Sequence, residues 1–270
     1  MSADVLVSLA VVAGFVVASE GARRCSGIVL AGTSLSAYAR ELVCTFQLCC
    51  CTHELKLLSE VGGIAPRIAL TFTYVLSVVH ALTFRGAIAN PSGALAHACR
   101  ARLSRGAALR RVACQFAAAV AARAAVRAVW SLGWSALHAR HRLLGYHCSS
   151  PIRVPLLMAT LVELACAFAI QTAITHTRAL EEKYRVHAVA VVITSTVYAG
   201  GSWTGAVSNP ALAFSTQFPC SGSSFSHYCA VYCLGPLLGT SASVLLSDRV
   251  VPWLLRTPAS PWQPESRKGQ

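Results

Sequence analysis

Long apolar blocks separated by short polar stretches make up most of this chain. The blocks run to roughly 18–25 residues, which is long enough to cross a bilayer as helices. This pattern predicts an all-α membrane protein rather than one or two soluble domains. The six long blocks are expected at 35–57, 66–84, 109–134, 154–176, 187–201 and 227–247, and two short apolar stretches at 90–101 and 209–218.

The order of the blocks repeats, since two long blocks, a short stretch and one long block occur twice. The two halves are 35–134 and 154–250. Around the short stretches, residues 86–94 and 205–213 both read Gly-Ala-aliphatic-small-Asn-Pro-small-x-Ala. These matches indicate an internal duplication. Because each half has three spans, an odd number, the second half enters the membrane in the opposite orientation, which makes an inverted repeat.

Each short stretch begins with Asn-Pro. Asn favours the N-cap position of a helix, and Pro favours its first turn. Both stretches are too short to span, so two half-helices are expected to dip in from opposite faces and to meet near the midplane, where non-helical backbone is tolerated only beside a cavity. A single Asn-Pro would equally mark a loop turn, but two in register favour half-helices. The expected pore-lining residues are Asn90, Pro91, Ser92, Asn209, Pro210 and Ala211.

Two half-helix N-termini facing one point create a positive field that repels cations, including hydronium. The Asn amides offer donors to a passing oxygen, and the carbonyls before each Asn offer acceptors. A water held by its oxygen cannot pass a proton along a file of waters. The arrangement therefore predicts passage of small neutral polar molecules and exclusion of ions.

The charge content agrees with a membrane protein. Only 12% of residues are charged, against about 25% in soluble domains. The net charge of +13 raises nucleic acid as a partner. However, the Arg residues lie mostly between apolar blocks, and no stacking motif is present, so the expected partner is the lipid bilayer and not nucleic acid.

Basic residues also predict the orientation. The segments 100–111, 178–185 and 249–268 carry most of them and lie on one side, which is therefore expected to be cytoplasmic. The segment 200–228 has no charged residue, as suits the opposite side. Three arginines between the halves contradict this orientation and are outweighed: Arg140, Arg142 and Arg153.

The twelve cysteines include no Cys-x-x-Cys pair, so neither a metal nor a cofactor is expected. Consecutive residues on a helix point in different directions, so 49–54 cannot converge on one ion. A disulfide involving Cys220, Cys229 or Cys233 is left open. Common hydrolase motifs and paired intramembrane Asp residues are absent from the sequence, so an enzyme is not expected.

Other polar residues in the blocks have two interpretations each. Glu41 and Glu163, one in the first span of each half, are functional by default as intramembrane carboxylates. Arg123 and Arg127 share a helix face and either pair with a carboxylate or extend to head groups. His80 either faces a vestibule or packs, and packing is favoured.

The N-terminal segment is apolar through residue 21, and its charges, Arg23 and Arg24, follow the apolar stretch. A signal peptide has the reverse order, so a signal anchor or an extra membrane helix is favoured. The tail from Arg256 is polar and proline-containing, and we expect it to be disordered.

The architecture and both Asn-Pro boxes resemble the aquaporins, in particular their unorthodox branch. The resemblance covers roughly 35–250, the expected channel domain, between an N-terminal segment, 1–34, and a tail, 251–270. It implies six spanning helices and two re-entrant half-helices, with Glu41 and Glu163 accepting hydrogen bonds from the re-entrant backbone. It also implies a role for Cys220 in assembly or channel integrity and a homotetramer with one pore per subunit. The expected location is the endoplasmic reticulum membrane, with the plasma membrane or another intracellular vesicle membrane as the alternative. The resemblance rests on residues 45–55, 151–154, 197–201 and 204–213.

Three positions depart from the orthodox family pattern. Ser92 stands where that pattern has Ala, and Leu212 stands where it has the filter Arg. The filter His falls by spacing at about Val197. An apolar filter implies passage of glycerol or hydrogen peroxide alongside water. The alternative is a membrane scaffold that keeps the fold without useful conduction.

Overall fold

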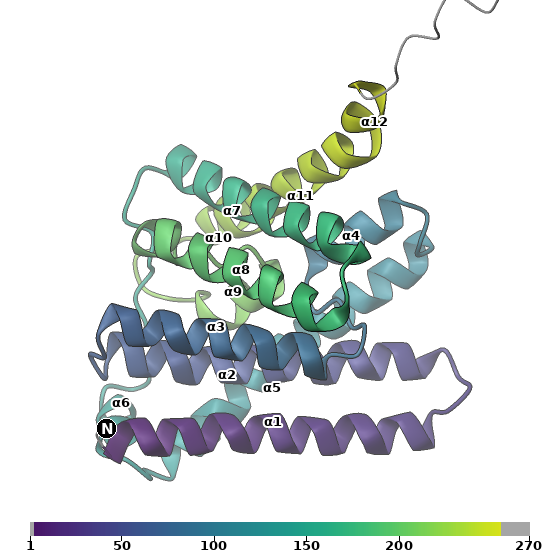
Figure 1. Cartoon of the computed structure of the whole chain (residues 1–270). Helices are drawn as coiled ribbons and strands as arrows, with labels where there is room; N and C mark the ends of the chain where they lie inside the picture. Colours follow the sequence, from purple (N-terminus) through teal and green to yellow (C-terminus); the bar gives the residue numbers. More distant parts are fainter. Residues whose placement is uncertain (1–2, 255–270) are drawn as a thin grey trace, which may run out of the picture.

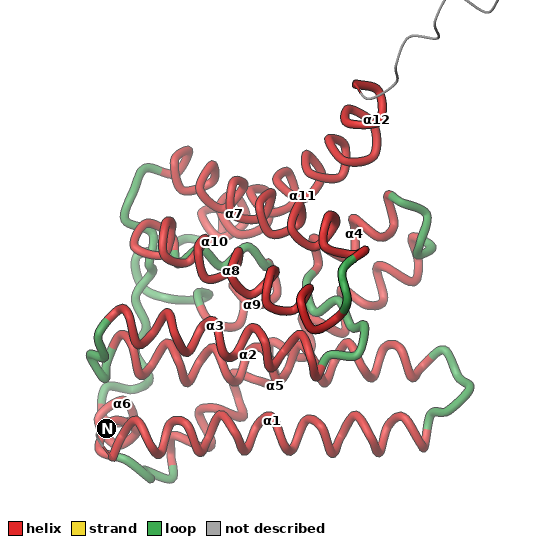
Figure 2. The backbone as a smooth tube through the Cα atoms, in the orientation of Figure 1, coloured by secondary structure: helices red, strands yellow, loops and turns green. Residues whose placement is uncertain are grey.

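The computed structural model describes residues 3–254 as a bundle of long helices with no strand in that range (Figures 1 and 2). The predicted all-α fold is confirmed. The expected disordered tail lies outside the described residues. The helices are α1 Ala3–Val29, α2 Leu35–Glu60, α3 Pro66–Thr83, α4 Pro91–Cys99, α5 Arg105–Ser131, α6 Ala136–Leu143, α7 Leu156–His176, α8 Glu182–Thr204, α9 Pro210–Thr216, α10 Phe225–Tyr228, α11 Gly235–Leu245 and α12 Val251–Leu254.

The duplication is visible in the packing. Elements α2 to α5 of the first half correspond to α7 to α12 of the second, in which α10, α11 and α12 join into one continuous helix, Phe225–Leu254. In both halves the first and third spans pack together most closely, α2 with α5 and α7 with α11. The short helices α4 and α9 contact each other in the middle of the bundle.

Glycine allows the close approach of α7 and α11. A Cβ atom on Gly239 would lie 2.1 Å from the Leu164 carbonyl oxygen, and one on Gly235 would lie 2.8 Å from the Thr160 carbonyl oxygen. In lipid, helices associate through such small-residue contacts because apolar burial against another helix gains little over lipid.

By length and composition, five of the described helices can cross a membrane: α1, α5, α7 with its 3-10 extension, α8 and the α10–α12 helix. The 26-residue α2 is long enough but too polar. Its polar residues are directed inward, because Glu41, Gln47 and Glu54 are all fully buried. A sequence-based hydropathy criterion therefore misses a helix whose polar side chains face protein instead of lipid.

Helix α1 packs along α2 at the edge of the bundle (Figure 1). It has 27 residues, more than the apolar stretch alone indicates, and it is the predicted extra helix. Near its start, the Ser8 hydroxyl donates to Glu54 Oε1 at 2.6 Å. Near its end, Arg23 Nη1 donates to Gln47 Oε1 at 2.7 Å. Polar contacts thus fix both ends of α1 to α2.

The chain path places the ends of the helices on two faces. One face carries the segments 61–65, 132–155 and 205–224, and it also carries a disulfide between Cys148 and Cys220. Disulfides persist in oxidising compartments, which agrees with the predicted non-cytoplasmic side. Two of the three conflicting arginines bind helix C-termini, since Arg140 donates to the Val61 carbonyl and Arg142 to the Ser131 carbonyl. They compensate helix dipoles there.

Candidate pore

The two Asn-Pro turns cap the half-helices. Asn90 Oδ1 accepts from the Ser92 amide at 2.9 Å. Asn209 Oδ1 accepts from the Ala211 and Leu212 amides at 3.1 and 3.2 Å. Both Asn residues are extended and both following prolines begin the helix, so α4 and α9 start as the sequence predicts.

Each Asn also binds the opposite half. Asn90 Nδ2 donates to the Ser208 carbonyl at 3.1 Å, and Asn209 Nδ2 donates to the Ala89 carbonyl at 2.8 Å. The carbonyls expected to serve a passing molecule are thus already engaged by the opposite Asn, although a carbonyl oxygen retains a second lone pair. These reciprocal bonds join the two half-helix starts into one unit.

A buried carboxylate supports the backbone before each turn. Glu41 accepts from the Ile88 and Ala89 amides, both at 2.9 Å. Glu163 accepts from the Val207 amide at 3.0 Å and the Ser208 amide at 2.6 Å. Ala89 and Ser208 have φ values of 50° and 51°, a left-handed conformation that is unfavourable for residues other than glycine. The carboxylates hold these two strained positions.

The further partners of the two carboxylates differ. Arg111 Nη1 and Gln115 Nε2 also donate to Glu41, at 2.9 and 3.0 Å. The Thr204 hydroxyl donates to Glu163 at 2.7 Å, and no cation pairs with Glu163 among the described residues. The first carboxylate is therefore an ion pair, and the second is held by neutral donors.

Two cavities adjoin each other and share part of their lining. The smaller, about 300 Å³, lies toward the disulfide face and is lined by both predicted filter residues, Val197 and Leu212. The larger, about 470 Å³, lies toward the opposite face and is lined by both Asn90 and Asn209. We call the seven residues that line both cavities the neck: Leu48, Ser77, His80, Ile193, Ala206, Val207 and Leu212.

The residues following each Asn do not line either cavity. Pro91, Ser92, Pro210 and Ala211 are buried and form the first turns of α4 and α9. The Ser92 hydroxyl has no hydrogen-bond partner among the described residues. Of the six residues expected to line the pore, Asn90 and Asn209 thus line the larger cavity, and the other four line neither of the two cavities.

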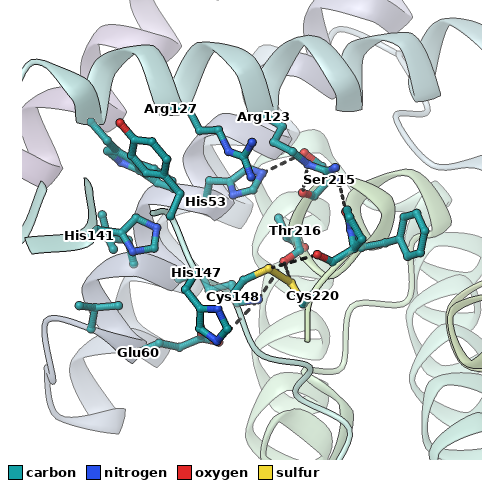
Figure 3. A pocket seen from close by; sticks show the side chains of 17 residues that line it. His53, Glu60, Arg123, Arg127, His141, His147, Cys148, Ser215, Thr216 and Cys220 are labelled. Atoms are coloured by element: carbon teal, nitrogen blue, oxygen red, sulfur yellow. Dashed lines mark hydrogen bonds and ion pairs between the residues drawn. A yellow bond between two sulfur atoms is a disulfide. The ribbon is translucent and has the colours of Figure 1, made fainter. Parts of the chain in front are cut away.

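A third cavity of about 70 Å³ lies beside the end of α9 (Figure 3). Arg123 donates to the Phe214, Ser215 and Phe218 carbonyls at that helix end. His53 shares a 3.0 Å hydrogen bond with the Ser215 hydroxyl. These contacts fix α9, so the Arg123 side chain pairs with backbone rather than with a carboxylate or head groups.

The same cavity is bordered by α6 and by the disulfide (Figure 3). Burial lowers the pKa of His141, and the nearby Arg127 guanidinium lowers it further. Among residues 3–254, no group of three or more His, Cys, Asp or Glu side chains is arranged to hold a metal ion.

The disulfide joins Cys220 to Cys148, with the Cα atoms 5.0 Å apart. Cys229 and Cys233 are free thiols. The prediction from the sequence left the partner of Cys220 open among three cysteines and did not include Cys148, although Cys148 lies on the same face. The bond ties the loop between the halves to the loop after α9.

Sequence reasoning also missed several positioning residues. Arg111 and Gln115 support Glu41, as described above. The Tyr228 hydroxyl donates to the Pro210 carbonyl at 2.9 Å, and the Tyr232 hydroxyl donates to the Thr204 carbonyl at 2.7 Å. Both tyrosines are buried, and a buried tyrosine in a membrane block is the signal that would have indicated a backbone partner.

Comparison with known proteins agrees with this geometry. The family model described as "Major intrinsic protein" matches residues 55–247. The chain belongs to the major intrinsic protein family. Members of this family are membrane channels and not enzymes, and both statements hold for this chain.

Two groups of relatives resemble this major intrinsic protein along most of its length. It is 41% identical to human aquaporin-11 over 218 residues, which cover 81% of this chain and 80% of the relative. It is 37% identical to mouse aquaporin-12 over 241 residues, covering 88% and 83%. The aquaglyceroporin from Plasmodium falciparum shares the fold, with a TM-score of 0.57 at 14% identity, and the match covers 80% of this chain and 98% of that one.

Proposed function

We propose that this protein is a passive channel for water and small neutral solutes such as glycerol and hydrogen peroxide. The observation that carries the proposal is the pair of reciprocal bonds that Asn90 and Asn209 make to the opposite half, at the lining of the larger cavity. The two helix N-termini there oppose cations, and the Asn amides lie beside the larger cavity.

The filter positions support a broader solute range than water alone. Val197 and Leu212 line the smaller cavity, and both are apolar. Without a filter Arg the pore has one fewer cationic barrier. The half-helix ends then carry the exclusion of protons and other cations.

The test is a hyperosmotic jump on vesicles containing the purified protein, run in parallel with water, glycerol and peroxide. Replacing both Asn90 and Asn209 with Ala should remove the permeability above that of empty vesicles. Leu212→Trp should do the same, because its side chain fills the neck while the backbone amide that Asn209 caps is kept. Leu157→Trp is the matched control, because Leu157 is 73% exposed on the outer face of α7.

The result also decides between the channel and a membrane scaffold. The apolar character of the neck favours the scaffold as second candidate. Vesicles with folded protein and no added permeability to any of the three solutes would sink the channel proposal and support the scaffold.

Assembly and location remain part of the proposal. The resemblance to aquaporins supports a homotetramer in the endoplasmic reticulum membrane, and a disulfide on one face supports an oxidising compartment there. Cross-linking in native membranes and organelle fractionation would test the two statements separately.

A further inference from the structure

The neck has one polar side and one apolar side. Of its seven residues, only Ser77 and His80 have polar side chains, and both belong to α3. The other neck residues are apolar and come from α2, from α8, which packs beside α3 (Figure 1), from the segment before α9 and from α9 itself: Leu48, Ile193, Ala206, Val207 and Leu212. A molecule that crosses the neck therefore meets hydrogen-bonding side chains from α3 alone.

His80 is the neck residue with an unused hydrogen-bonding atom. It is 8% exposed, and neither ring nitrogen has a hydrogen-bond partner among the described residues; of the two, Nε2 is fully buried and Nδ1 is not. The Ser77 hydroxyl already donates to the Thr73 carbonyl at 2.8 Å. The imidazole stacks on Phe84 with ring centroids 5.1 Å apart, which holds the ring in place.

The polar groups behind His80 are satisfied without it. Gln47 Oε1 accepts from Arg23 at 2.7 Å, and Gln47 Nε2 donates to the Thr83 hydroxyl at 3.1 Å. That hydroxyl donates in turn to the Val79 carbonyl at 2.8 Å. A buried imidazole atom without a partner costs free energy, and nearly all such groups in native proteins have a partner. The partner left for the accessible Nδ1 of His80 is a molecule inside the neck.

We propose that His80 forms a binding site at the neck for one small, neutral, hydroxyl-bearing molecule, either water or a solute. A neutral imidazole carries one donor and one acceptor nitrogen. The imidazole replaces a hydrogen bond that the molecule loses when it leaves the water of the cavity and enters the neck. The inference rests on the proposed channel function, because it names the residue that determines which molecules cross.

The experiment compares three variants in the same vesicles. His80→Phe keeps a flat ring but removes both nitrogens. His80→Asn keeps a donor and an acceptor in a smaller side chain. His187→Phe is the matched control, because His187 lies at the same α3–α8 contact, bonded to the Tyr74 hydroxyl at 2.7 Å, but lines neither cavity.

Water and peroxide permeability should fall about fivefold in His80→Phe, the size expected for losing one hydrogen bond. His80→Asn should stay within about twofold of the parent for water and should raise the glycerol-to-water ratio, because it keeps the hydrogen bond and widens the neck. His187→Phe should match the parent. If His80 had only a structural role, its replacement would not change the ratio of glycerol to water permeability.

The outcomes separate the two proposals. A parent protein no more permeable than empty vesicles contradicts the channel itself. A conducting parent with His80→Phe equally permeable overturns only the site at His80. If His80→Phe does not elute as folded protein, the glycerol-to-water ratio of His80→Asn decides, and an unchanged ratio overturns the proposal.

Discussion

The two halves perform the same task with different chemistry. Both hold a left-handed backbone position before an Asn-Pro turn with a fully buried glutamate. In the first half that glutamate is paired with Arg111, whereas in the second it accepts only from amides and one hydroxyl. Duplication thus preserved the acceptor geometry and not the charge balance. The backbone amides are the common requirement, and the cation is specific to one half.

The largest expected effect comes from removing the charge in each half. Glu41→Gln leaves the partly buried Arg111 without its carboxylate and should destabilise the protein by about 3 kcal/mol, the lower end of the range for a broken buried pair. Glu163→Gln weakens hydrogen bonds from neutral donors and leaves no unpaired cation, so it should cost about 1–3 kcal/mol. Thermal unfolding in detergent, followed by the loss of the folded peak on size exclusion, measures both.

A double variant sharpens this comparison. Glu41→Gln combined with Arg111→Met removes both charges and should recover part of the loss, because no unpaired charge remains. Equal losses in the two single glutamate variants, with no recovery in the double variant, would show that the ion pair contributes nothing specific to the first half.

The next effect concerns the disulfide, which exists beside the second half-helix and has no counterpart beside the first among the described residues. Its cysteines are 72 residues apart. The chain-entropy model gives about 4 kcal/mol as an upper value for a loop of that size. Cys148→Ser, Cys220→Ser and the double variant should therefore lower the melting temperature equally, as should reduction of the parent.

Unequal melting temperatures among these variants would point to a different role for Cys220. If Cys220→Ser destabilises the protein or alters its oligomeric state while Cys148→Ser does not, the thiol acts outside the disulfide. The assembly role that the resemblance implies would then be the better explanation.

The smallest effect compares the residues after each Asn-Pro. Ala211 is fully buried, and Ser92 is buried with an unpartnered hydroxyl. Ser92→Ala should change stability by no more than about 1 kcal/mol, and in the stabilising direction. Ala211→Ser should cost about 1–3 kcal/mol, because it buries a hydroxyl. Melting curves of the two variants decide, and a clear loss in Ser92→Ala would show that its hydroxyl has a partner.

Sequence reasoning located the features that depend on local structure. The capping Asn, the following Pro and the upstream glutamates occur twice in matched order, so comparing the chain with itself was enough to find them. The left-handed positions at Ala89 and Ser208 were not found, because nothing in an Ala or a Ser indicates a positive φ.

Contacts between residues on different helices or loops could not be predicted from the sequence. Arg111 and Gln115 reach Glu41 from another helix, and Cys148 reaches Cys220 from another loop. Their partners depend on how helices pack, which residue spacing within one helix does not define. The arginines at 140 and 142 show the same limit, because a charge count treats them as topology signals while the fold uses them at helix ends.

Helix α1 has a consequence for measuring topology. The five helices that length and composition allow to span, together with α2 and α3 beside them, make seven passes when α1 is counted, and residues 3 and 254 lie at opposite ends of the bundle (Figure 1). A pair of identical compartment-sensitive reporters, one fused before α1 and one after α12, would therefore give opposite signals. A protein of the same fold without α1 would give the same signal at both ends.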